Sequence, residues 1–204
     1  MWRSLLAAAT GYLAGTLPSA DLAARAATHG SVDLHHTGTG NPGALNTSLV
    51  IGKKWGTAVL AADVGKGFLA ARAGLVIAGG TGSHVAATSA VLGHCYPVWT
   101  GFDGGKGVAT SVGQVLGTFP TYFPIDFAVA GATAAVPAWK RRTFAATAVA
   151  AVAWTTSALL WWRRGWPTLW GPEPTVALPV AAAASSAIIV ARFLQEGVEE
   201  IPEA

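Results

Sequence analysis

Long runs without a charged side chain dominate this sequence, and they set the class of fold. Each approaches the roughly 20 residues that a helix needs to cross a bilayer. The runs are Ser4–Ala20, Ala73–Phe102, Gly107–Ile125, Thr143–Trp162 and Pro174–Ala191, and two more spans, Trp55–Ala78 and Asp126–Trp139, follow if isolated charges are tolerated. With 52% hydrophobic and 11% charged residues, the composition is wrong for a soluble domain. We predict an all-α, polytopic membrane helical bundle with about seven transmembrane helices, in which residues 1–204 form a single integral membrane domain.

The distribution of lysine and arginine predicts the orientation of the bundle. If the first span starts outside, the outer loops hold Arg3, Arg163 and Arg164, while the inner loops and tail hold Lys53, Lys54, Lys106, Lys140, Arg141, Arg142 and Arg192. This asymmetry favours an external N-terminus and a cytoplasmic C-terminus. Two glycine-rich loops, around residues 36–54 and 99–107, would then open to the cytoplasm.

The first span has only one arginine as a basic flank, so we interpret it as a retained helix rather than a cleaved signal peptide. The glycines at positions 11 and 15 within it suit close helix packing in lipid. The one cysteine, Cys95, excludes an internal disulfide and is expected to be inert packing. The net charge of +3 reflects topology, and no nucleic-acid partner is expected.

The segment Gly101-Phe102-Asp103-Gly104-Gly105-Lys106-Gly107, here called the glycine–lysine loop, is the most informative stretch. Glycines let several backbone N–H groups point at one anion, and the lysine adds a full positive charge. A phosphate suits such a nest. The nucleotide P-loop spacing fails, because only three residues separate Gly101 from Gly105-Lys106 and no Ser or Thr follows the lysine. An ATPase is therefore a poor reading.

A second unusual stretch, residues 37–47, is here called the asparagine loop. It holds Thr39, Asn41 and Asn46 together with Gly38, Gly40 and Gly43. The asparagine amides both donate and accept hydrogen bonds, and the glycines allow close approach of a ligand. The same residue types also make ordinary polar connections, so both readings stay open.

Charged and imidazole side chains inside the apolar runs need partners. Asp63 and Lys66 share a helix face, and we expect either a structural ion pair or, as the functional alternative, a pair that holds one of the two glycine-rich loops in place. His94 lies next to the glycine–lysine loop, where it either contacts a phosphate or makes a structural hydrogen bond. The remaining histidines near the first loop, His29, His35 and His36, form no convincing ligand set, so no metal site and no cofactor are expected.

These motifs occur in the order and spacing of a known family. They are Thr39-Gly40-Asn41-Pro42-Gly43-Ala44-Leu45-Asn46, Gly52-Lys53-Lys54-Trp55-Gly56, Asp63 with Lys66-Gly67, Gly93-His94 with Pro97, and Gly101 through Thr110. The chain resembles the bacterial acyl-phosphate-dependent glycerol-3-phosphate acyltransferases, in strong detail over about residues 10–117. Beyond Gly117 only hydropathy and length agree.

The resemblance implies a bacterial inner-membrane enzyme that transfers a fatty acyl group from acyl phosphate to glycerol 3-phosphate, giving lysophosphatidate. It implies no acyl-enzyme intermediate. The site residues expected from the motifs are Thr39, Asn41, Asn46 and Lys106 for catalysis, and Gly40, Gly43, His94, Gly104, Gly105, Lys106 and Gly107 for substrate binding. An acyl phosphate is already activated, so alignment and charge stabilisation are the main tasks.

Thr39 replaces a serine of the family pattern and keeps its hydroxyl, whereas three other positions lose a charged or polar group of the pattern. Leu49 stands where the pattern has arginine, and by spacing Ser186 and Ile189 stand where it has histidine and asparagine. Two function classes therefore remain open: an active acyltransferase of divergent specificity, or a catalytically impaired relative that binds glycerol phosphate or a phospholipid precursor and modulates a partner enzyme. A small transporter is weaker, because no inverted repeat is visible.

Overall fold

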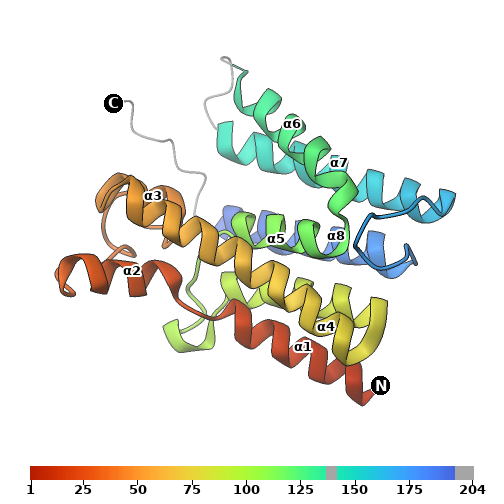
Figure 1. Ribbon diagram of the computed structural model, residues 1–204. Coiled ribbons are helices and arrows are strands. Elements are labelled where there is room, and N and C mark those ends of the chain that lie inside the picture. Colours follow the sequence, from red (N-terminus) through yellow and green to blue (C-terminus); the bar gives the residue numbers. More distant parts are fainter. Residues whose placement is uncertain (137–141, 196–204) are drawn as a thin grey trace.

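The computed structural model describes residues 1–136 and 142–195, and within these ranges every regular element is helical. The elements are α1 (Trp2–Gly15), α2 (Ser19–Thr28), α3 (Ala44–Val50), α4 (Lys53–Cys95), η1 (Val98–Thr100), α5 (Val108–Thr118), η2 (Pro120–Tyr122), α6 (Phe123–Ala134), α7 (Arg142–Arg164) and α8 (Ala177–Gln195), where η marks a short 3-10 turn. Figure 1 shows the long helices packed side by side as a bundle. The all-α prediction is confirmed.

Helix α4 is folded back on itself at Ala78 and Gly79. Ala78 has φ −142°, and Gly79 has φ +67°, a left-handed conformation that glycine adopts without strain. Gly74 and Gly82 bring the two arms together, because a Cβ on Gly82 would lie only 2.4 Å from the Gly74 carbonyl oxygen. The predicted span Trp55–Ala78 thus ends at the turn. The next predicted span began too early, since residues 73–78 still belong to the first arm.

Small residues let other helices pack closely on both arms of α4. A Cβ on Gly11 or Gly15 of α1 would lie 2.0 Å from the Ala86 carbonyl oxygen or 2.1 Å from that of Ala90. On the first arm, a Cβ on Gly113 of α5 would lie 1.9 Å from the Val64 carbonyl oxygen. Backbones this close leave no room for a side chain, which confirms the close packing predicted from the glycines of α1.

Two predicted boundaries were wrong, for local reasons. Helix α1 ends at Gly15 rather than Ala20, because Pro18 cannot continue a helix and restricts the residue before it. Helix α5 ends at Thr118, and Pro120 starts η2 instead of extending the span to Ile125. The asparagine loop is not a turn throughout, since α3 starts at Ala44 within it.

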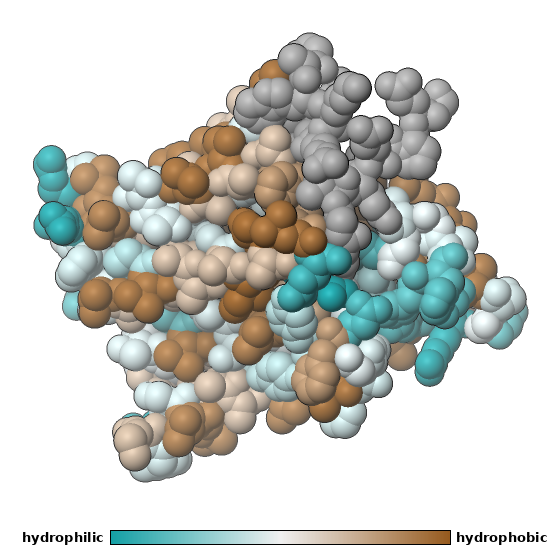
Figure 2. Space-filling view, turned by 180° about the vertical axis from the view of Figure 1, so that it is seen from behind, coloured by the Kyte–Doolittle hydropathy of each residue, from teal (hydrophilic) through white to brown (hydrophobic). Residues whose placement is uncertain are grey.

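Three segments of the described chain are long and apolar enough to cross a bilayer: Lys53–Thr100, which contains the fold in α4, Phe144–Arg164 and Ala177–Gln195. Figure 2 shows a mostly pale and brown band between two edges where hydrophilic residues gather. The count of about seven crossings stays a prediction. The end of the predicted span at Trp139, the basic residues Lys140 and Arg141, and the acidic tail 196–204 lie outside the described residues.

Two apolar clusters mark opposite ends of the space between α4, α5, α7 and α8. One contains Cys95 with Val91, Ile189 and Phe193, close to the glycine–lysine loop. The other contains Phe119 and Tyr122, stacked at a centroid distance of 5.4 Å, together with Trp154 and others. Cys95 is fully buried, as expected for a packing residue.

Candidate active site

A buried ion pair forms the floor of the site. Lys66 Nζ donates to Asp63 Oδ1 at 2.8 Å, and the two side chains are 6% and 2% exposed. Lys66 also donates to Ser19 Oγ at 3.0 Å and to the Leu17 carbonyl oxygen, so its three protons all have acceptors. Ser19 Oγ donates in turn to Asp63. The pair therefore ties the first arm of α4 to the linker between α1 and α2.

The glycine–lysine loop lies directly over His94, the penultimate residue of α4. Gly105 N–H donates to the His94 carbonyl oxygen at 3.1 Å, and a Cβ on Gly105 would come within 2.3 Å of His94 Nε2. A Cβ on Gly104 would lie 2.2 Å from the same carbonyl oxygen. On its other side, His94 Nδ1 lies 3.6 Å from Asp63 Oδ1. The histidine thus connects the ion pair to the loop, and only glycine fits above it.

A polar pocket lies between the glycine–lysine loop, the Asp63–Lys66 ion pair and the segment that joins α2 to α3. Its walls come from the α1–α2 linker, from Lys66 and His94 of α4, and from Gly104 and Gly105. His35 and Pro42, from the segment between α2 and α3, complete the wall. Two of the expected phosphate-binding glycines and His94 therefore share one pocket.

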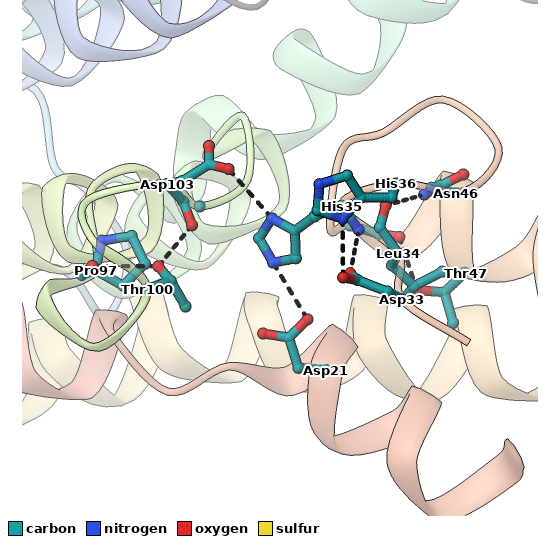
Figure 3. Close-up of polar contacts among 12 residues, drawn as sticks. Asp21, Asp33, Leu34, His35, His36, Asn46, Thr47, Pro97, Thr100 and Asp103 are labelled. Carbon is teal, nitrogen blue, oxygen red and sulfur yellow. Dashed lines mark hydrogen bonds and ion pairs between the residues drawn. The ribbon is translucent and has the colours of Figure 1, made fainter. Parts of the chain in front are cut away.

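A charged cluster closes one side of this pocket (Figure 3). The His35 ring lies between two carboxylates, with Nε2 3.4 Å from Asp21 Oδ1 and Nδ1 3.3 Å from Asp103 Oδ2. Arg192 of α8 donates to Asp103 Oδ1 and, at 2.8 Å, to the Gly104 carbonyl oxygen. Burial alone would raise the pKa of Asp103, but the Arg192 hydrogen bond and charge, followed by His35, lower it below its usual value. The cluster joins four separate segments of the chain.

The asparagine loop is organised by a buried amide. Asn46 Nδ2 donates to the carbonyl oxygens of Leu34 (3.0 Å) and Thr37 (2.9 Å), and its Oδ1 accepts from Thr39 N–H at 2.8 Å. All three contacts are to backbone, so Asn46 positions the loop. Asn41 differs, because its Oδ1 is buried without a hydrogen-bond partner among the described residues. Of the two asparagines, Asn41 therefore has the side-chain oxygen that no described residue uses and that is left to accept a hydrogen bond from a ligand.

Lys106 lies at the start of α5. Its Nζ is 4.9 Å from the centroid of the Phe193 ring, a cation–π contact. Gly107 has φ +79° and supplies no side-chain cap, so the first N–H groups of α5 point out of the helix next to the lysine. An uncapped helix N-terminus beside a lysine favours an anion.

The expected site residues thus fall into three groups. The pocket wall contains His94, Gly104 and Gly105, whereas Lys106 and Gly107 lie just beyond it at the start of α5. The expected residues Thr39, Gly40, Asn41, Gly43 and Asn46 form the adjoining loop and are not part of the pocket wall. A Cβ on Gly43 would approach Asn41 Nδ2 to 3.3 Å, so this glycine leaves room for the amide.

Sequence reasoning missed most of the charged cluster. Asp103 lies inside the glycine–lysine loop, and the sequence offers His35 only as a candidate metal ligand. The sequence carries no signal for the contacts of Asp21 and Arg192 in the cluster, or of Ser19 in the floor, because their partners lie far away along the chain. No group of three or more His, Cys, Asp or Glu residues in the described ranges is arranged to hold a metal ion.

The three positions that depart from the family pattern lie in two places. Leu49 is 57% exposed on α3. Ser186 and Ile189 of α8 line a large apolar cavity that starts beside the glycine–lysine loop. A Cβ on Gly107 would lie 3.3 Å from Ile189 Cγ1, so α8 packs directly behind the loop.

Comparison with known proteins agrees with this arrangement. A family profile described as glycerol-3-phosphate acyltransferase matches residues 5–198. Proteins named glycerol-3-phosphate acyltransferase from Maricaulis maris and Gloeobacter violaceus are 39% and 38% identical, over 78% and 80% of this chain and 72% and 80% of theirs. The fold matches crystal structures of PlsY (YgiH), an integral membrane glycerol 3-phosphate acyltransferase, in its glycerol 3-phosphate form (TM-score 0.73, 30% identity) and its lysophosphatidic acid form (0.72, 29%). Each match covers 94% of this chain and 88% of the other.

Proposed function

Because this chain belongs to the glycerol-3-phosphate acyltransferase family, we propose that the glycine–lysine loop binds the phosphate of glycerol 3-phosphate and that an acyl phosphate is the acyl donor. The chain is a membrane acyltransferase of phospholipid synthesis, and lysophosphatidate is its product. The observation that carries the phosphate assignment is the uncapped N-terminus of α5 next to Lys106, with His94 beneath the preceding glycines.

The acceptor hydroxyl attacks the acyl carbonyl carbon, the carbon–oxygen bond to phosphate breaks, and inorganic phosphate leaves. An oxygen of a substrate phosphate takes the hydroxyl proton. We assign Lys106 and the loop N–H groups to stabilising the negative charge that develops, and Asn41 and Thr39 to aligning the reacting end. Asn46 supports them by holding the asparagine loop in place through its three backbone contacts.

Direct transfer to the acceptor is supported by the hydroxyl groups of the pocket wall, each of which donates to a protein acceptor. Thr16 donates to the Leu13 carbonyl oxygen, Ser19 to Asp63, and Thr100 to the Asp103 carbonyl oxygen. Thr16 and Thr100 donate to backbone carbonyl oxygens, which do not take up a proton, and the carboxylate that accepts from Ser19 is already paired with Lys66 at 2.8 Å, so none of these hydroxyls is activated as a nucleophile. An acyl-enzyme intermediate is therefore not part of the proposal.

We also propose that residues 1–204 form one domain in the bacterial inner membrane, with the site facing the cytoplasm. In Figure 1 the chain begins at one end of the bundle, and α2, α3 and the loops they flank lie at the other. Lys53, Lys54 and Lys106 belong to the loop end, whereas Arg3 lies at the N-terminal end. This distribution follows the positive-inside rule.

The test uses purified protein in detergent with radiolabelled glycerol 3-phosphate and palmitoyl phosphate. We expect lysophosphatidate to form, and Lys106→Ala to lower kcat/KM by at least about 100-fold, as for loss of one oriented charged donor. The matched control is Lys54→Ala, an exposed lysine at the start of α4. Equal activity of Lys106→Ala and Lys54→Ala would refute the role of the loop, and transfer from palmitoyl-CoA but not from palmitoyl phosphate would refute the donor.

A further inference from the structure

Two consecutive residues near the end of α8 contact the glycine–lysine loop. Arg192 donates to the Asp103 carboxylate and to the Gly104 carbonyl oxygen, which holds the first half of the loop against α8. Phe193, the next residue, contacts the second half, since its ring centroid lies 4.9 Å from Lys106 Nζ. Arg192 therefore fixes α8 relative to the loop, and Phe193 reaches the lysine from the same helix.

The Phe193 ring itself has a fixed place. It is 2% exposed and packs with Val91, Cys95 and Ile189 in the apolar cluster behind the loop. Its centroid lies 5.8 Å from that of Phe144, on α7, at an interplanar angle of 58°. Neighbours on α4, α7 and α8 thus hold the ring, so it offers a well-defined surface to the lysine.

The backbone of the loop rests on the same apolar cluster. A Cβ on Gly107 would lie 2.7 Å from Cys95 Sγ and 3.3 Å from Ile189 Cγ1. A side chain at this position would push the loop away from the cluster. The glycine therefore brings Lys106 close to the surface to which Phe193 belongs.

A lysine that binds an anion gains from such a surface. Its ammonium group is carried by a flexible four-carbon stem, and ordering that stem costs conformational entropy. The face of an aromatic ring attracts the ammonium through the ring quadrupole. Because the ring is neutral, it orients the lysine without cancelling the positive charge that an anion needs.

We propose that Phe193 is a positioning residue for Lys106, and that its ring holds the ammonium group beside the N-terminus of α5 where a substrate phosphate binds. The ring face occupies one side of the ammonium, and the N–H groups on the other side donate to the anion. This inference rests on the proposed role of Lys106 in phosphate binding and acyl transfer. It adds the group that keeps the lysine in place.

A purely structural role for Phe193 makes a different requirement. A buried ring contributes apolar area to a cluster, and the stem of a lysine often lies along apolar surface. Packing of this kind needs the volume and the apolar character of the ring, whereas attraction of the ammonium needs electron density on the ring face. Fluorine substituents withdraw that electron density and change the volume little, so they separate the two roles.

The experiment replaces Phe193 in the full-length protein by mono-, di- and trifluorophenylalanine and measures kcat/KM for glycerol 3-phosphate, with palmitoyl phosphate as donor. We expect kcat/KM to fall with each added fluorine, to about fivefold below the wild type in the trifluoro variant, the scale of one partly buried cation–π contact. The dissociation constant of radiolabelled glycerol 3-phosphate, measured on the same proteins, should rise in the same steps. Phe193→Leu, which removes the ring and keeps an apolar side chain, should weaken both by at least as much.

The matched control is the same fluorinated series at Phe144, whose ring packs against Phe193 in the same cluster. It should leave both values unchanged. A Phe193 series that is flat in both assays, or an equal change in the Phe144 series, would overturn the proposal and assign the ring to packing. A graded weakening of binding without turnover would uphold the positioning role and refute only the proposed donor.

Lys106→Ala separates a failure of this inference from a failure of the proposed function. If Lys106→Ala has lost activity and binding while the Phe193 series is flat, only the positioning role is refuted. If Lys106→Ala matches Lys54→Ala in both assays, the role of the lysine is refuted and the positioning role with it.

Discussion

Replacing Gly105 by alanine tests whether phosphate binding depends on the close packing of the glycine–lysine loop on His94. The new Cβ would lie 2.3 Å from His94 Nε2, about 1 Å closer than ordinary van der Waals contact. His94 is buried and lies beside Asp63, so it has little room to withdraw. Overpacking of this kind costs about 1–3 kcal/mol, which corresponds to a roughly 5- to 150-fold weaker acceptor complex.

The assay measures KM for glycerol 3-phosphate and kcat separately, together with direct binding of radiolabelled glycerol 3-phosphate. We expect KM to rise and kcat to change less, because the substitution disturbs the phosphate nest rather than the asparagine loop. Gly65→Ala is the control, since its Cβ would meet open space. In a double-mutant cycle with His94→Ala, the Gly105→Ala penalty should shrink. An unchanged acceptor affinity, or a penalty that persists without the His94 ring, would refute the reasoning.

Three further predictions concern packing, charge and pH. Gly15→Leu should lower the thermal midpoint in detergent by several degrees, because its Cβ would lie 2.1 Å from the Ala90 carbonyl oxygen; a midpoint like that of the wild type would contradict this packing. Leu49→Arg should raise kcat/KM about tenfold, the scale of one charge-assisted hydrogen bond, whereas the uncharged Leu49→Gln should not; no difference between the two would count against a role for charge there. Because Arg192 holds the pKa of Asp103 below its ordinary value of 3.8, the carboxylate stabilises the fold above pH 3.8, and this contribution is lost as the pH falls through the lowered value. The thermal midpoint of Arg192→Gln should therefore lie below that of the wild type at pH 7, and the difference should shrink as the pH falls below 3.8; a difference that is absent, or that stays constant with pH, would exclude the contact.

Much of the bundle could be predicted from the sequence, because apolar runs and small residues act locally. Residues 55–78 predict the first arm of α4 with its correct end, and the glycines at 11 and 15 predict close packing of α1. The breaks at Pro18 and Pro120 were also present as local signals, but uninterrupted hydropathy outweighed them. Proline restrictions decide helix ends even where the surrounding residues are apolar.

The charged cluster could not be predicted in the same way, because its pairs depend on tertiary proximity. His35 and Asp103 are separated by 68 positions and Asp103 and Arg192 by 89. No periodicity links such residues. The sequence and the structure favour different roles for Asn46 for a related reason, since its motif position predicts a reactive amide whereas its burial and its three backbone contacts favour a positioning role.

The buried ion pair has a consequence for how the chain enters the membrane. Asp63 and Lys66 contact Leu17 and Ser19, which are synthesised earlier. Because synthesis runs from the N-terminus, the oxygens of Leu17 and Ser19 are available as partners when the charged arm of α4 arrives. Charges inserted alone would cost roughly 2.5 to 3.5 kcal/mol each. The order of residues along the chain therefore lets the linker between α1 and α2 supply hydrogen-bond partners to Asp63 and Lys66 during biosynthesis.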